Sequence, residues 1–152
     1  ERTSAALQML SNEALAPPLP GSLADFLRDV LIAAADRAAG ADRLAQRAFD
    51  AVAAGPAQAV NSLMALGLLG DIDRSFAVAD AFYCRKGAVT VPTHSAQLAP
   101  VNEMGRRLTQ VLFTPACAAM RGDSRFDRMC ERIGLSSYWQ ATGREPDFSS
   151  AR

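Results

Sequence analysis

The apolar residues of this chain recur with the period of an α-helix in one segment after another, and glycine or proline separates the segments. The segment between Ser22 and Gly40 is typical, with one face formed at i, i+3, i+4, i+7 and i+8 by Leu23, Phe26, Leu27, Val30 and Leu31. Thirty alanines and few Thr, Tyr or Ile among the 152 residues favour helix over sheet. The pattern therefore predicts an all-α fold.

Glycine, proline and capping residues mark where the helices begin and end. A short helix is expected over 4–16, before a run of prolines, and two helical hairpins are expected over 22–87. The four hairpin helices should span 22–39, 42–54, 56–69 and 72–86, with Ser22 and Asp71 as N-caps. The third of them is apolar nearly all round, so we expect it to be buried between its neighbours.

The pattern changes after the second hairpin. Pro92 and Pro100 exclude a continuous helix over 88–100, which is expected to be a loop. The C-terminal helices and cap should occupy 101–148, as a helix at 102–113, a helical turn to residue 120, a helix capped by Asp123 and a last turn or two at 135–142. A chain of this length, with 49% hydrophobic residues, is expected to be a single helical-repeat domain over 1–152.

Two of the helix junctions are alike. Gly40 and Gly70 lie thirty residues apart, and each is followed by a polar cap and, five positions on, by a small residue, Ala45 or Ser75. Self-similarity at such a period indicates stacked helical hairpins, although a plain antiparallel bundle would show the same caps and faces. The junction beginning Gly70-Asp-Ile resembles the start of the second helix of a tetratricopeptide repeat. That resemblance implies tetratricopeptide-like helical hairpins stacked in a short superhelix.

The C-terminal end carries a second resemblance. Its motifs are Leu112-Phe-Thr-Pro115, Asp123-Ser-Arg-Phe126, Arg132-Ile-Gly-Leu135, Tyr138-Trp139 and Gly143-Arg-Glu-Pro-Asp-Phe148. Together they resemble an ending that closes the tetratricopeptide-like region of proteobacterial regulators, often behind a winged-helix DNA-binding or adenylate-cyclase-type domain. The resemblance covers 56–148 and implies a fragment of a longer signalling or transcription regulator. Its implied role is protein–protein or intramolecular regulatory interaction, with no catalytic residues to transfer.

The resemblance also places a candidate partner groove and a candidate cap. In tetratricopeptide repeats, ligands lie against the first helix of each hairpin, which here implies Val60, Met64, Gly67 and Leu68. These residues are apolar, so we favour the other interpretation, that the protein's own chain fills the groove and they pack in the core. Tyr138 and Trp139 follow the last long helix, either as a lid over the end of the array, which we favour, or as an aromatic anchor for a partner.

No constellation of reactive residues accompanies these features. Cys84, Cys117 and Cys130 are widely spaced and form no CxxC pair, so buried free thiols are expected rather than a disulfide framework or a metal site. His94 is the only histidine, and neither a nucleophile elbow nor a phosphate-binding glycine loop is present. We therefore expect a protein that is not an enzyme and that holds no cofactor or metal.

Charge and hydropathy narrow the choice of partners. The 16 basic and 16 acidic residues balance, whereas a nucleic-acid-binding face usually brings a basic excess, so direct nucleic-acid binding is not expected. No apolar run is long enough for a membrane span. The arginines at 121, 125, 128 and 132 alternate with acidic residues and predict local ion pairs on a solvated face. Free cysteines favour the cytoplasm.

The alternative function is a small-molecule sensor with an apolar pocket between helices, covered by the loop at 88–100.

Overall fold

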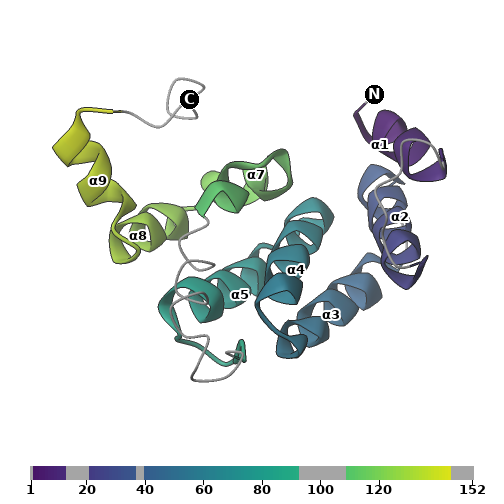
Figure 1. The fold of residues 1–152 in the computed structure, drawn as a ribbon, viewed down its shortest axis with the longest axis horizontal. Coiled ribbons are helices and arrows are strands. Elements are labelled where there is room, and N and C mark those ends of the chain that lie inside the picture. Colours follow the sequence, from purple (N-terminus) through teal and green to yellow (C-terminus); the bar gives the residue numbers. More distant parts are fainter. Residues whose placement is uncertain (1, 13–20, 37–39, 93–108, 145–152) are drawn as a thin grey trace.

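Every regular element in the part of the chain that the structure describes, residues 2–12, 21–36, 40–92 and 109–144 of a computed structural model, is a helix (Figure 1). The α-helices are α1 (Arg2–Ser11), α2 (Gly21–Asp36), α3 (Ala41–Ala51), α4 (Pro56–Leu69), α5 (Ile72–Cys84), α7 (Ala118–Arg121), α8 (Arg125–Arg132) and α9 (Leu135–Thr142). The 3-10 helices are η1 (Val52–Ala54), η3 (Thr109–Phe113) and η4 (Pro115–Cys117). The predicted all-α class is confirmed, and no described helix is both long and apolar enough to cross a membrane.

Local sequence accounts for most helix ends. Gly70 closes α4 with φ +77°, a left-handed conformation that glycine adopts without strain. The carboxylate of Asp71 then accepts a hydrogen bond from the backbone N–H of Arg74 at 3.0 Å, which confirms Asp71 as the N-cap of α5. Pro56 occupies the first turn of α4, where the missing N–H costs no hydrogen bond.

Two predicted caps are wrong. Helix α2 already begins at Gly21, so Ser22 lies within its first turn instead of preceding it. The N-cap position of α8 belongs to Ser124, whose side chain makes no capping bond. The carboxylate of Asp123, one residue before Ser124, accepts a hydrogen bond from the backbone N–H of Arg125 at 2.9 Å. This N–H in the first turn of α8 therefore still has a partner.

The helices pack around α4, which contacts α2, α3, α5, η4 and α7. Contacts between α2, α4 and η4 join the first helices of successive pairs, and contacts between α3, α5 and α8 join the second ones. Figure 1 shows the result as an open arc, with α1 and α2 at one end and α8 and α9 at the other. One continuous core runs from Val30 of α2 to Cys130 of α8, and it includes the fully buried Leu66 and Phe126.

Several predicted segments lie partly outside the described residues, among them the helix at 22–39, which is described to Asp36. The predicted helix at 102–113 is described only over Thr109–Phe113, and that part is the 3-10 helix η3 instead of an α-helix. The predicted loop at 88–100 is described only to residue 92 and has no regular structure there. The first helix ends at Ser11, and the described chain stops at residue 12, so the predicted extension to 16 lies beyond it.

Candidate interaction surface

The four candidate groove residues all lie on α4, but the structure does not bring them together as one groove. Gly67 is buried, and a Cβ built on it would lie 2.4 Å from the carbonyl oxygen of Ala116 in η4. That position is therefore filled by the chain's own backbone. Val60 and Met64 are partly buried and pack against the core, while the Leu68 side chain is 38% exposed. Gly67 is therefore packed in the core, whereas Leu68 is exposed to solvent.

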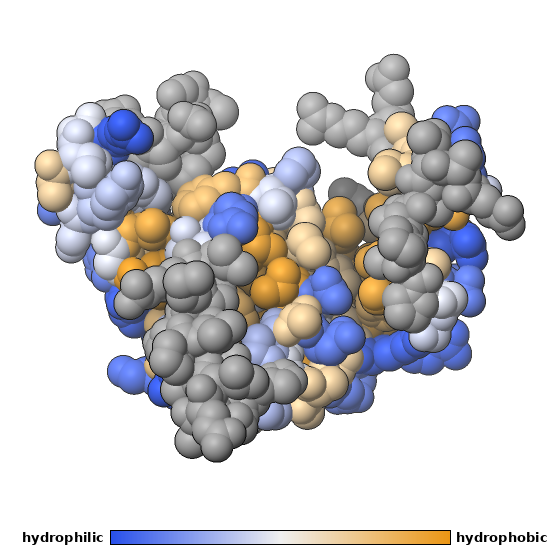
Figure 2. Space-filling view, viewed as in Figure 1, coloured by the Kyte–Doolittle hydropathy of each residue, from blue (hydrophilic) through white to orange (hydrophobic). Residues whose placement is uncertain are grey.

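The accessible side of α4 carries no charge. We call it the α4 stripe, and it consists of Ala57, Val60, Asn61, Met64 and Leu68, about one helical turn apart. All other α4 residues between Ala59 and Gly67 are buried, so the predicted all-round burial holds for this central part of the helix except along the stripe. The exposed positions of η4 and α7, which contact α4, are also uncharged, namely Pro115, Ala118 and Ala119. Figure 2 shows apolar side chains gathered where α4 and α7 lie, between two more polar ends.

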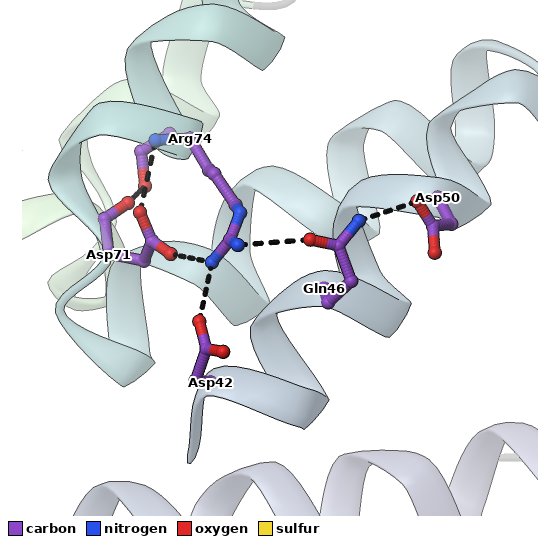
Figure 3. A network of polar contacts seen from close by, with 6 residues as sticks. Asp42, Gln46, Asp50, Asp71 and Arg74 are labelled. Atoms are coloured by element: carbon purple, nitrogen blue, oxygen red, sulfur yellow. Dashed lines mark hydrogen bonds and ion pairs between the residues drawn. The ribbon is translucent and has the colours of Figure 1, made fainter. Parts of the chain in front are cut away.

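The layer formed by α3, α5 and α8 is different, because charged side chains tie its helices together. Arg74 of α5 donates from Nη1 to the carboxylate of Asp42 at 2.9 Å and from Nη2 to Oε1 of Gln46 at 2.9 Å, both on α3 (Figure 3). Arg74 also pairs with the carboxylate of Asp71 at 2.6 Å. Hydrogen bonds to these two carboxylates raise the pKa of Arg74. A single guanidinium thus fixes the register of two helices.

A second set of charged contacts joins α5 to α8, and we call these two sets of contacts the charged seams. Arg125 pairs with Asp73 at 2.7 Å and with Asp123 at 2.8 Å, and its guanidinium carbon lies 4.5 Å from the centroid of the Phe76 ring. Arg132 of α8 also pairs with Asp80 of α5. Hydrogen bonds from Arg125 lower the pKa of Asp123 to about 2, and the carboxylates raise the pKa of Arg125.

These contacts correct the prediction of local ion pairs along α8. Only Arg125–Asp123 is local, whereas Arg125–Asp73 and Arg132–Asp80 bridge 52 positions in sequence. Arg121 donates to the backbone carbonyls of Leu112 and Thr114, at 2.9 Å each, and so holds η3 in place. Because Asp42 and Asp73 remain 89% exposed, their pairs orient the helices more than they stabilise them.

The charged seams also account for two surface depressions. One, of about 520 Å³, lies beside Asp42, Asp71 and Asp73. The other, of about 410 Å³, lies between Phe76 and the arginines of α8. Among the described residues, no group of three or more His, Cys, Asp or Glu side chains is placed to hold a metal ion. Both depressions therefore belong to the surface of an ion-paired scaffold.

The two candidate cap residues face different surroundings. The Trp139 ring packs against the core and meets the Phe113 ring edge to face, with centroids 6.2 Å apart, and Phe113 in turn meets Phe126 at 6.2 Å. Tyr138 is 52% exposed. The lid therefore remains a prediction for Trp139, while Tyr138 presents its ring to solvent, as an anchor would.

The reactive side chains are buried or lie outside the described residues. Cys117 and Cys130 are buried and Cys84 is partly buried, all as free thiols. Burial raises the pKa of all three thiols, that of Cys130 to about 11, so they are poor nucleophiles near neutral pH. His94 lies outside the described residues.

The uncharged α4 stripe and the exposed Tyr138 are therefore two surface features, in the described part of the chain, to which the intramolecular contacts give no role. The family resemblance placed Val60, Met64 and Leu68 of the stripe in a groove, whereas the apolar pattern of α4, which is the same on every side, predicted their burial. Comparisons with protein-family models, with curated protein sequences and with solved structures found no match for this chain.

Proposed function

We propose that this chain is a non-catalytic interaction domain whose α4 stripe docks a protein partner or another domain of the same chain. The observation that carries the proposal is the absence of charge along the accessible side of α4, from Ala57 to Leu68. A helix side that only meets water is usually charged or polar, and an exposed apolar line usually marks an interaction site.

The arrangement of charge supports this assignment. Arginine and aspartate side chains on the α3–α5–α8 layer are paired with one another, which leaves that layer as a tied scaffold. The α2–α4–η4 layer contains the uncharged stripe instead. An ion-paired layer on one side and an uncharged, largely apolar stripe on the other is an arrangement that suits a domain that binds a partner through one face.

Three observations favour tetratricopeptide-like stacking over a plain bundle. First helices contact first helices, and second helices contact second helices, along the arc. The two small residues at matching positions after Gly40 and Gly70 are both buried, Ala45 at 2% and Ser75 at 0% exposure. The C-terminal motifs resemble those of bacterial regulators. The proposed setting is therefore the cytoplasmic interaction region of a signalling or transcription regulator.

The alternative function, a small-molecule sensor built on an apolar pocket between helices, has less support. It requires a cavity closed by the loop at 88–100, and most of that loop lies outside the described residues. The depressions beside Asp71 and Arg128 are open to solvent and lined by charged side chains. The interaction surface on α4 is the better supported assignment.

Charge introduced on the stripe tests the proposal. The chain is used as bait in lysate of its source bacterium, and captured proteins are compared between the wild type and Leu68→Glu. The matched control is Met9→Glu, which places the same charge at a 51% exposed apolar site on α1. We expect Leu68→Glu to lose a specific, saturable partner that Met9→Glu retains. Retention by a folded Leu68→Glu, with loss by Tyr138→Glu, would move the docking site to α9.

A further inference from the structure

A third depression, of about 270 Å³, lies between α2, the α3–η1 segment and α4 and has no role in the interaction described above. Its apolar wall comes from Leu23 and Phe26 of α2 and from Ala51 and Ala54. Its polar wall comes from α4 and α3 and includes Asn61, Ser62 and Arg47. The depression thus differs from the other two, each of which is lined by at least four charged side chains.

The Ser62 hydroxyl faces this depression without a protein partner. Ser62 is only 2% exposed, yet it forms no hydrogen bond with any other residue that the structure describes. Every fully enclosed side-chain oxygen or nitrogen among those residues does have a partner. The Ser62 hydroxyl is therefore open to the depression that it lines, where a bound group could satisfy it.

Arg47 supplies an uncommitted positive charge at the same place. Its guanidinium carbon lies 4.9 Å from the centroid of the Phe26 ring, a cation–π contact that holds the side chain over the apolar wall. Unlike Arg74, Arg125 and Arg132, Arg47 pairs with no carboxylate in the described part of the chain. Its planar fork of donors matches a carboxylate.

We propose that this depression binds a small organic carboxylate with a compact apolar body. Arg47 pairs with the ligand carboxylate, and the Phe26 ring packs against the apolar body of the ligand. The Ser62 hydroxyl and the Asn61 side-chain amide form hydrogen bonds with the polar end of the ligand, which is its carboxylate. The size follows from the volume, which lies just below the range of roughly 300–1,000 Å³ that holds drug-sized ligands. Because Asn61 also belongs to the α4 stripe, the ligand would lie beside the first turns of the proposed docking surface.

Phenylacetate is a suitable probe, because it joins a carboxylate to one aromatic ring. Titrated into the 152-residue chain and followed by two-dimensional NMR, it should saturate with a dissociation constant of about 1–10 mM, the scale for a ligand of roughly ten non-hydrogen atoms. Arg47→Gln should weaken binding at least about tenfold, because the charge-assisted contact is lost. Arg43→Gln removes another exposed arginine of the same helix, one outside the depression, and should change the affinity by less than about twofold.

Two further measurements separate this site from general attraction of anions. Phenylacetamide has the same shape without the charge and should bind at least about tenfold more weakly than phenylacetate. Asn61→Asp places a negative charge beside the ligand carboxylate and should abolish binding, which gives a second variant if Arg47→Gln misfolds. Absence of saturable binding, equal weakening by Arg43→Gln and Arg47→Gln, or equal affinity for phenylacetamide would each overturn the proposal.

Discussion

A methyl group added at Gly67 is expected to destabilise the fold, even though alanine is the better helix former. The new Cβ would lie 2.4 Å from the carbonyl oxygen of Ala116, 3.1 Å from its carbonyl carbon and 3.4 Å from the Cα of Cys117. A carbon atom and a heavy atom that is not bonded to it normally stay about 3.5 Å or more apart, so α4 and η4 must separate by about 1 Å to make room for the new Cβ. All three atoms belong to backbone, and no side-chain rotation relieves the contact.

The magnitude follows from two opposing effects. Alanine in place of glycine within a helix stabilises by about 1 kcal/mol. Overpacking a well-packed core destabilises by about 1–3 kcal/mol, and the upper value applies because backbone must move beside the fully buried Leu66 and Cys117. The net loss for Gly67→Ala is therefore about 2 kcal/mol, or about 4–8 °C in melting temperature for a chain of this size.

Urea unfolding measures this loss directly, and Gly122→Ala is the matched control. At Gly122 the added Cβ would lie 3.7 Å from the Ala119 carbonyl oxygen, an ordinary contact, and φ is −83°. Gly122→Ala should therefore leave stability unchanged or raise it by up to about 1 kcal/mol. A Gly67→Ala protein as stable as the wild type would refute the close approach of α4 and η4.

Three further predictions concern the C-terminal helices and the thiols. Trp139→Ala should lower the free energy of unfolding by about 2–3 kcal/mol, below the range for a fully buried Trp because the ring is partly exposed, whereas Tyr138→Ala should change it by less than about 0.5 kcal/mol in the same urea assay. Native protein treated with a thiol reagent should be labelled at Cys84 alone, and the two buried thiols should react only after unfolding, as read by mass spectrometry; full labelling of the folded chain would contradict their burial. The pKa of Asp123 falls from 3.8 to about 2 on folding, because Arg125 favours the carboxylate, so its stabilising effect is complete above about pH 4 and is lost as pH falls to 2. Asp123→Asn should make the urea midpoint less dependent on pH between 4 and 2, and an unchanged slope would argue against the pair.

Helix ends could be predicted from the sequence wherever the signal is local. The pairs Gly55-Pro56 and Gly70-Asp71 combine a residue that tolerates left-handed or unusual backbone with one that starts a helix, and α4 and α5 begin there. Ser22 shows the limit of such signals, because a good capping residue does not show how far the preceding chain has already turned.

The contacts between helices could not be predicted in this way. Arg125 and Arg132 lie among acidic neighbours on their own helix, yet their partners Asp73 and Asp80 lie 52 positions earlier. Spacing within a helix identifies only neighbours three or four residues away. The tetratricopeptide resemblance assigned Gly67 to a groove, and no local pattern could show that a carbonyl of η4, a helix distant in sequence, fills that place.

The exposed side of α4 also depended on the tertiary arrangement. Its sequence is apolar on every side, and only the number and position of packed helices decide which side stays open. Periodicity therefore predicted the helix and most of its burial, while the arc of neighbours leaves Leu68 exposed and Met64 only partly buried.

Methionine oxidation tests the central claim, that the α4 stripe is the docking surface, because the chain has natural reporters at suitable places. Met64 lies in the stripe, Met9 is 51% exposed on α1, and Met120 and Met129 are fully buried. The chain is oxidised briefly in buffer and in lysate of the cells that it comes from, and each methionine is measured by mass spectrometry relative to Met9. We predict that the oxidation of Met64 falls in lysate while the buried methionines stay unreactive in both. Equal oxidation of Met64 in both samples, with a partner bound to the chain, would contradict the account.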